Sequence, residues 1–200
     1  MTVREILADI KSPRKKKVVI DTDAYNEIDD QYAIAYSYYS DKIDIVAIHA
    51  APFENEKSDN MEYGMEKSFE EINKVLGLLG DDGKIPTFKG SRASIEKSGE
   101  IQDSEAARNL IKVVKESDEI VYVLVTGPCT AVVSAYLMDP SIADNMCVLW
   151  LGAHCFDIPN CYVRECNLDG DYIAGKLLFN LDIPLLLIFS RISSSISVEY

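Results

Sequence analysis

The chain has 200 residues, a length that suits a single domain with a sizeable core. Acidic residues number 33 against 20 lysines and arginines, so the formal net charge is −13. Nucleic-acid backbones and anionic lipid surfaces attract basic proteins, and this charge balance therefore argues against both as partners. No apolar run in the sequence approaches the ~20 residues of a membrane-spanning helix.

The five cysteines are odd in number, show no paired spacing and follow no apolar leader segment. This pattern is typical of reduced thiols and predicts a cytoplasmic location. A zinc site formed by Cys155, Cys161, Cys166 and His154 lacks support, because the sequence contains no C-x-x-C pair there.

Residues 1–16 are polar and mixed in charge, and we expect an N-terminal extension there, before a domain at 17–200. Short apolar runs then alternate with helical patterns. Strands are expected at 17–21, 43–49, 85–88, 120–125, 146–151 and 184–189, and helices at 27–39, 60–79, 104–116, 129–138 and 172–180. The alternation predicts an α/β fold, a doubly wound and mainly parallel sheet with helices on both faces. The polar stretch 89–103 is expected to be a long loop.

The loop after the first expected strand is crowded with acids. Asp21 and Asp23 follow the buried-type run, and Glu27, Asp29 and Asp30 lie at the start of the next helix. Two like charges ~4 Å apart repel by about 4 kcal/mol at an effective dielectric of ~20. Such a cluster needs protons, arginines or a metal ion, and a hard divalent cation is the simplest solution.

Other interpretations of this loop are open. Asn26 could cap the helix, which explains the three acids of its first turn but leaves Asp21 and Asp23 at the strand end unexplained. An EF-hand loop is excluded, because Asn26 stands where that loop needs glycine. The DxD pattern also resembles haloacid dehalogenase phosphatases, with Asp21 as nucleophile and Asp23 as acid, although Tyr25 departs from their pattern.

Further polar residues follow other expected strands, at the sheet edge where parallel sheets bind ligands. They are Thr126 in the segment TGPCT at 126–130, His49, His154, Asn160, Glu165 and Asn167. Amide and carboxylate side chains can form hydrogen bonds with the hydroxyls of a sugar, but a solvent-exposed loop that binds no ligand could contain the same residues. A lone histidine after a strand is more often structural than catalytic.

Four segments taken together resemble the inosine-uridine-preferring nucleoside hydrolases. They are VVIDTD at 18–23 followed by Asp29 and Asp30, LVTGPCT at 124–130, DPSIA at 139–143 followed by VLWLG at 148–152, and ECN at 165–167 followed by Asp171 and Ala174. The first segment is fairly specific, and the order and spacing of the set strengthen the others. The resemblance covers nearly the whole chain.

The resemblance implies a calcium-dependent hydrolase of ribonucleosides. Asp23, Asp30 and the Thr126 carbonyl would bind Ca²⁺, and Asp23 would also take a proton from the attacking water. The residues implied to hold the ribose hydroxyls are Asp29, Asn160, Glu165 and Asn167, with Asp21 and Asn26 in support. A metal ion and a nearby carboxylate both activate water, and an acidic pocket stabilises the cationic sugar that forms as a glycosidic bond breaks.

The chain departs from the family pattern in three ways. Residues 24–28 separate the second and third aspartates of the first motif, where the family has a Pro-Gly and one more residue. Asn160 precedes Glu165 by one residue fewer than is common. The family also continues beyond the point matching Tyr200, with a segment that supplies a histidine for the leaving base and a last calcium ligand.

We therefore expect a truncated hydrolase whose base side is incomplete. His49 or His154 would then protonate the leaving base. The alternatives are a non-catalytic relative that binds metal or nucleoside without turnover, and the phosphatase. Exposed apolar surface would favour association of copies of the chain.

Overall fold

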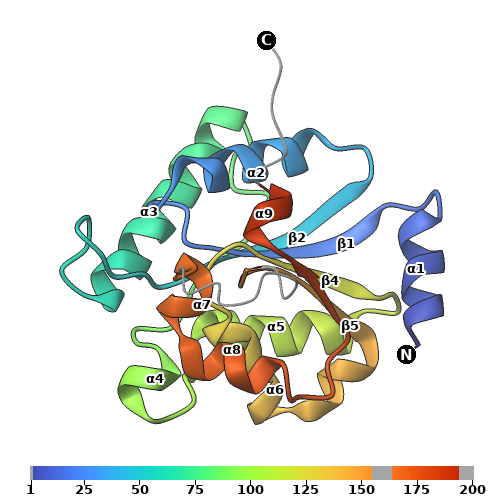
Figure 1. The fold of residues 1–200 in the computed structure, drawn as a ribbon. Coiled ribbons are helices and arrows are strands. Elements are labelled where there is room, and N and C mark those ends of the chain that lie inside the picture. The colour runs from blue at the N-terminus through green and yellow to red at the C-terminus, as the bar shows by residue number, and fades with distance from the viewer. Residues whose placement is uncertain (1, 155–163, 194–200) are drawn as a thin grey trace.

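The computed structural model describes residues 2–154 and 164–193 (Figure 1). Its centre is a six-stranded sheet in the order β3-β2-β1-β4-β5-β6, and every neighbouring pair is parallel. The strands are β1 (Lys16–Thr22), β2 (Ile43–Ala50), β3 (Thr87–Lys89), β4 (Val121–Val125), β5 (Met146–Leu151) and β6 (Leu185–Ile188). The predicted α/β fold with a parallel sheet is confirmed.

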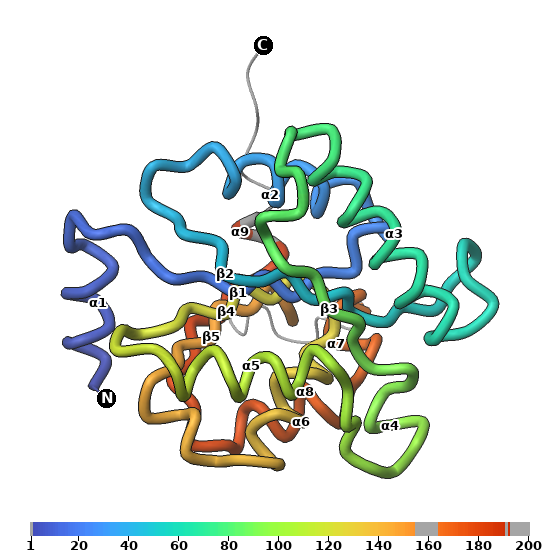
Figure 2. The backbone as a smooth tube through the Cα atoms, turned by 180° about the vertical axis from the view of Figure 1, so that it is seen from behind, coloured from blue at the N-terminus to red at the C-terminus, as the bar shows by residue number. Residues whose placement is uncertain are grey.

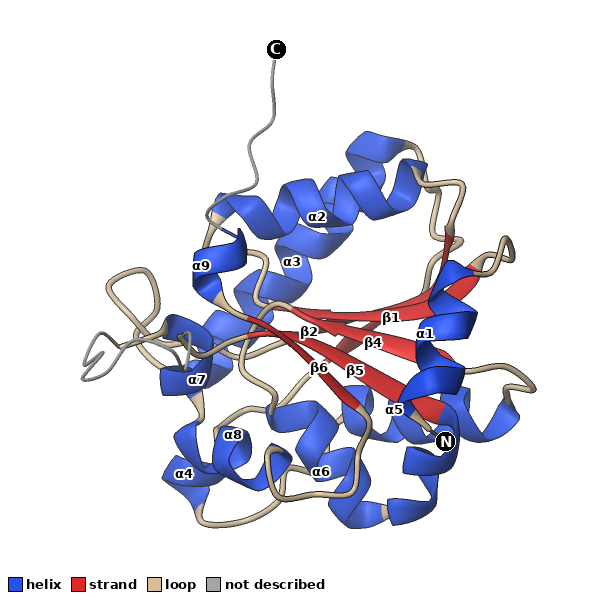
Figure 3. Cartoon of the chain, turned by 45° about the vertical axis from the view of Figure 1, so that its right-hand side comes forward, coloured by secondary structure: helices blue, strands red, loops and turns tan. Residues whose placement is uncertain are grey.

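Helices lie on both faces of this sheet. They are α1 (Val3–Lys11), α2 (Ile28–Tyr39), α3 (Met61–Leu79), α4 (Ile95–Ser98), α5 (Glu105–Glu116), α6 (Thr130–Met138), α7 (Cys166–Gly170), α8 (Tyr172–Leu178) and α9 (Ser190–Ser193), with a 3-10 helix η1 at Pro140–Asn145. Helices α2 and α3 cover one face over β1 and β2, whereas α5, α6 and α8 lie on the other, as Figures 2 and 3 show. None of the described helices is both long and apolar enough to cross a membrane.

The alternation of strand side chains builds a core on each side of the sheet. Val18 and Ile20 pack with Ile34 of α2 on one side, and Val19 packs with Leu110 of α5 on the other. All five are almost fully buried. Burial on both faces explains why the strands of a parallel sheet are apolar throughout.

Each predicted strand and helix is present, with small differences at its ends. Strand β3 begins two residues later than expected, because the Ile85 amide donates to the Asp81 carboxylate (2.9 Å) instead of joining the ladder. The short helices α4, α7 and α9 were not predicted. Helix α4 interrupts the loop expected at 89–103, where Ser94 caps it by accepting from the Lys97 amide.

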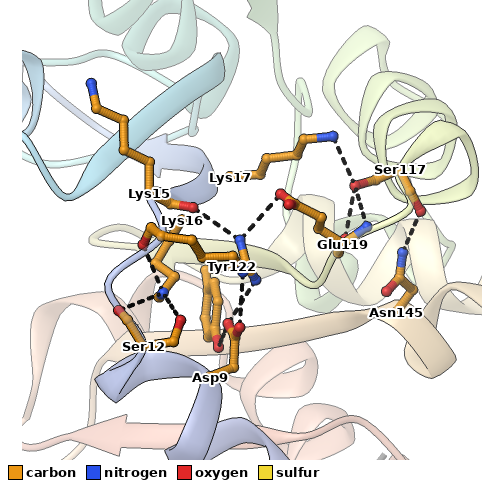
Figure 4. Close-up of polar contacts among 10 residues, drawn as sticks. Asp9, Ser12, Lys15, Lys16, Lys17, Ser117, Glu119, Tyr122 and Asn145 are labelled. Carbon is orange, nitrogen blue, oxygen red and sulfur yellow. Dashed lines mark hydrogen bonds and ion pairs between the residues drawn. The ribbon is translucent and has the colours of Figure 1, made fainter.

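Helix α1 is a further correction, since residues 1–16 were expected only as a polar extension. Thr2 and Glu5 form a reciprocal capping box, and Ile6 is buried in the core. The Tyr122 hydroxyl donates to Asp9 (2.7 Å), and Arg14 binds Asp9 as well, which anchors α1 to β4 (Figure 4). The T-x-x-E pattern at residues 2–5 was the available sequence signal.

Strand register brings the carboxyl ends of β1, β2 and β4 together. Asp21 pairs in register with His49 on one side and with Val125 on the other. Beyond the strands, the Thr126 amide donates to the Asp21 carbonyl (2.9 Å), and the Ala51 amide donates to the Thr22 carbonyl (2.9 Å). The three loops that follow these strands therefore start from fixed positions at one sheet edge.

Candidate active site

Two buried carboxylates form the centre of this edge. Asp23 in the β1–α2 loop and Asp30 in the first turn of α2 are only 2% and 5% exposed, whereas Asp29 between them in the helix start is exposed. The Thr22 hydroxyl donates to Asp30 Oδ1 (2.6 Å), and the Thr126 hydroxyl donates to the same oxygen. These bonds connect the ends of β1 and β4 to α2.

Burial and mutual repulsion make ionisation of this pair unfavourable. Burial, followed by the nearby charge of Asp30, raises the pKa of Asp23 well above its usual value. Burial also raises the pKa of Asp30 to about 6, although the hydroxyls of Thr126 and Thr22 lower it. No lysine or arginine side chain in the described segments forms an ion pair with either carboxylate. The pair therefore requires a proton or a cation.

A cavity of about 260 Å³ opens beside this pair. Seven residues singled out from the sequence line it: Asp23, Asn26, Asp29, Asp30, Thr126, Glu165 and Asn167. His154, considered only as a donor to the leaving base, lines it too. Five further lining residues were not predicted as parts of the site, although Glu27 and Cys166 belong to the segments discussed: Glu27, Leu151, Arg164, Cys166 and Ser190. Asn160 lies outside the described residues.

Asp21 and His49 do not line this cavity, and they lie side by side on the neighbouring strands β1 and β2. Both oxygens of Asp21 are buried and have no hydrogen-bond partner within residues 2–154 and 164–193, and burial raises the pKa of Asp21 to about 7. His49 is fully buried, with its Nε2 2.8 Å from Asn109 Oδ1 of α5. Burial lowers the pKa of His49 to about 4. Of the two candidate donors to the leaving base, this position favours His154.

Glu165 and Asn167 connect α7 to the end of β5. The Glu165 carboxylate accepts from the amides of Asn167 (3.0 Å), Leu168 (2.9 Å) and Ala153 (2.7 Å). Asn167 donates a side-chain proton to the Leu151 carbonyl (2.8 Å). Glu165 therefore caps α7 and fixes the loop after β5, in addition to lining the cavity.

The suggestion that Asn26 caps α2 is wrong. Helix α2 begins at Ile28, and its N-cap position is Glu27, whose side chain forms no capping bond. Asn26 donates instead to Asp23 Oδ2 (2.9 Å), while its backbone amide donates to the Asp23 carbonyl (2.6 Å). The amide thus turns toward the acidic pair rather than toward the helix.

The described residues contain no group of three or more histidine, cysteine, aspartate or glutamate side chains that could hold a metal ion. The expected calcium set is compatible with this result, because only two of its protein ligands, Asp23 and Asp30, are side-chain carboxylates. Cys155 and Cys161 of the unsupported zinc set lie outside the described residues.

One protein-family model matches most of the chain. The model of the family described as inosine-uridine preferring nucleoside hydrolase matches residues 18–192. The chain belongs to this family. All four motif segments, from Val18 to Ala174, fall within the matched range. A search of curated protein sequences found no match.

Solved nucleoside hydrolases share the fold. A plant nucleoside hydrolase, PpNRh1, is 22% identical with a TM-score of 0.71, over 88% of this chain and 60% of that one. An inosine-guanosine nucleoside hydrolase is 19% identical with a TM-score of 0.72, over 90% of this chain and 63% of that one. The purine-preferring ribonucleoside hydrolase from Gardnerella vaginalis is 21% identical with a TM-score of 0.67, over 87% of this chain and 60% of that one.

This member of the nucleoside hydrolase family is therefore short. It spans 60–63% of the length of these solved structures. Its aspartate motif, the Thr126 segment and the Glu165–Asn167 segment nevertheless meet around one cavity.

Proposed function

We propose that the chain hydrolyses the N-glycosidic bond of ribonucleosides, with Ca²⁺ bound by Asp23, Asp30 and the Thr126 carbonyl. The observation that carries this proposal is the buried Asp23–Asp30 pair, held by two threonine hydroxyls at a cavity in a nucleoside hydrolase fold. The oxygen-only donor set suits a hard cation, and a cation would favour the ionised carboxylates whose pKa burial now raises. When bound, Ca²⁺ would increase the acidity of a water and neutralise the acidic pair.

The chain's own residues would perform the remaining steps. Asp23 would accept a proton from the water that adds to C1′ of the ribose as the bond from C1′ to the base nitrogen breaks. Asp29, Glu165 and Asn167 would accept or donate hydrogen bonds to ribose hydroxyls, with Asn160 as a further candidate. The surrounding carboxylates would stabilise the positive charge that develops on the sugar. His154 would give a proton to the departing base.

The walls of the adjoining space favour an uncharged substrate. A second cavity of about 660 Å³ shares Asp23, Asn26, Glu27, Arg164 and Cys166 with the first. Its other acidic lining residues include Glu54, Glu56, Glu96 and Asp169. Its two cations are already paired, Lys97 with Glu54 and Arg164 with Asp169. A nucleoside therefore fits better than a nucleotide, whose phosphates these acids would repel.

Ribose release tests this proposal directly. The purified chain is incubated with a panel of purine and pyrimidine ribonucleosides, with Ca²⁺ and again with a chelator. We expect release that depends on calcium and that nucleoside 5′-phosphates do not support. Folded protein that releases no ribose under any of these conditions would overturn the proposal.

A second candidate is a binding protein without turnover. It is favoured by the described residues, which contain no group of three or more histidine, cysteine, aspartate or glutamate side chains that could hold a metal ion. Calorimetric titration with Ca²⁺ and with ribose, combined with the release assay, separates the two candidates, because a non-catalytic relative would bind either ligand but release no base.

The phosphatase interpretation does not fit the geometry. Its nucleophile would be Asp21, but this side chain is 1% exposed and does not line the cavity that holds Asp23. A nucleophile must contact the substrate, so a buried Asp21 cannot serve in this arrangement.

We also propose a cellular location from the cysteine thiols and self-association from the exposed surface. The described thiols of Cys129, Cys147 and Cys166 are free, which supports a reducing compartment such as the cytoplasm.

Tyr32 and Tyr36 of α2 are 67% and 79% exposed, and this apolar surface supports self-association. Light scattering across a concentration series would measure it.

A further inference from the structure

The loop that carries Asp23 is held by the loop after β2. Asn55 donates from Nδ2 to Asn26 Oδ1 (2.7 Å), and Asn26 in turn donates from Nδ2 to Asp23 Oδ2 (2.9 Å). Lys57 donates from Nζ to the Asn26 backbone carbonyl (2.5 Å). Residues 29 and 31 positions along the chain thus hold the side-chain oxygen and the backbone carbonyl of Asn26, while its side-chain nitrogen binds Asp23.

The direction of these two amides is determined by their partners. Asn55 Oδ1 accepts from the Lys57 backbone amide (2.9 Å), so its NH₂ group is the end that reaches Asn26. Asn26 must then accept with its oxygen and donate with its nitrogen. If the Asn26 amide were flipped, its oxygen would face the Asp23 carboxylate and its NH₂ would face the NH₂ of Asn55. The chain of bonds therefore runs in one direction, from Asn55 to Asp23.

We propose that Asn55 and Asn26 form an amide relay that fixes the orientation of the Asp23 carboxylate for proton transfer. The relay rests on the role proposed for Asp23. It holds Oδ2, so the carboxylate is prevented from rotating and Oδ1 remains for water and cation. Asn26 belongs to residues 24–28, where the chain departs from the family pattern, whereas Asn55 comes from the loop after β2.

Both asparagines are positioning residues in this proposal, since Asn55 acts only through Asn26. Misplacing a reacting group by a fraction of an ångström lowers the rate of the chemical step more than it affects substrate binding. The relay therefore predicts a lower kcat with little change in KM. A loop anchor without this role would instead change stability, or change KM and kcat together.

A double-mutant cycle tests the relay, with Lys57→Met as the matched control. We expect Asn26→Ala and Asn55→Ala each to lower kcat by about 10- to 100-fold while KM stays within about twofold. The double variant should be no slower than Asn26→Ala, because Asn55 has no path to Asp23 without Asn26. Lys57→Met removes a bond between the same two loops but not the amide chain, so its kcat should be unchanged. Additive losses in the double variant, or an equal loss in Lys57→Met, would overturn the relay.

A second measurement does not depend on turnover and distinguishes failure of the relay from failure of the proposed function. In ¹⁵N-labelled protein, Asp23→Asn identifies the side-chain NH₂ signals of Asn26 that respond to this carboxylate. The relay predicts that Asn55→Ala shifts these signals and speeds their exchange with water, whereas Lys57→Met leaves them near their original positions. Equal responses in the two variants, or none in Asn55→Ala, would contradict the relay even in a chain that releases no ribose.

Discussion

Thr126 at the end of β4 donates its hydroxyl proton to Asp30 Oδ1 in the first turn of α2. Thr22 at the end of β1 donates to the same oxygen, so one carboxylate oxygen joins three elements. This arrangement follows from register, because β1 and β4 pair directly and the Thr126 amide bonds to the Asp21 carbonyl. The position of Asp30 is thus set by the two strands on which the site is built.

Thr126→Val tests the contribution of this hydroxyl, because valine keeps the size and the backbone carbonyl of threonine. A hydrogen bond to a charged group contributes about 1.5–3 kcal/mol, which corresponds to roughly 10- to 100-fold in affinity. We therefore expect calorimetry to show calcium binding weakened by about tenfold or more. Thr126→Ser retains the donor and should bind like the parent chain. Equal affinities in the valine and serine variants would contradict this role.

Asp30→Asn should abolish calcium-dependent ribose release, since an amide cannot supply the negative charge that holds the cation. Asp21→Asn should have the smaller effect, because Asp21 does not line the cavity. Initial rates at saturating nucleoside compare the two variants, with circular dichroism as the control for folding. A larger loss in Asp21→Asn would be the pattern expected of the phosphatase.

His154→Ala should slow the release of bases that need a proton to leave. His154 lines the cavity, and its Nε2 is buried without a partner among the described residues. A 4-nitrophenyl riboside releases 4-nitrophenolate, a stable anion that does not need that proton, so its hydrolysis should change little. Rates with both substrates are measured in His154→Ala and in His49→Gln, which is the matched control. Unchanged nucleoside turnover in His154→Ala would exclude His154 as the donor.

The strands and the Asp23–Asp30 pair could be predicted, because the residue patterns that indicate them lie within short segments of the sequence. Residues 146–151 are apolar throughout, as a strand buried on both faces requires, and β5 has these bounds. Asp23 and Asp30 follow a strand end whose position the topology fixes at the ligand-binding edge.

The relay and the buried histidine could not be predicted in this way. Asn26 looks like a helix cap from its neighbours, and its actual partner Asn55 is 29 residues away. His49 was expected to follow its strand like a site residue, but it lies within β2, where its Nε2 is 2.8 Å from Asn109 Oδ1 of α5. Contacts of this kind depend on how separate elements pack, and no local pattern in one sequence encodes them.

Asp171→Asn should destabilise the fold strongly. Its fully buried carboxylate accepts from the amides of Ile95 (2.7 Å), Glu96 (3.2 Å) and Ala174 (3.0 Å), and from the Thr130 hydroxyl (2.7 Å).

Each oxygen of Asp171 has two donors, so an amide nitrogen in either position would face donors and leave them unsatisfied. We expect the free energy of unfolding in urea to fall by about 2–4 kcal/mol. Asp103→Asn, which removes only a surface ion pair with Arg108, is the control and should change stability little. Similar stabilities for the two variants would contradict this assignment.

His49 should make the stability of the fold depend on pH in a defined window. Burial lowers its pKa from 6.5 to about 4, so between these values the unfolded chain binds a proton that the folded chain does not. The stabilisation is fully present above pH 6.5 and is lost as the pH falls through about 4. The neighbouring Asp21, with a pKa of about 7, is mostly uncharged in this window and cannot offset the histidine charge.

The difference between the folded and unfolded pKa of His49 corresponds to about 3 kcal/mol. Other carboxylates also titrate at low pH, so the informative quantity is the comparison with His49→Gln, which keeps a polar group near Asn109 but does not titrate. Urea unfolding at pH 7.5 and pH 4.5 should show a larger loss of stability in the parent chain than in the variant. Parallel pH profiles would mean that His49 is protonated in the folded chain, which its enclosed position between Asn109 and Phe88 does not allow without rearrangement.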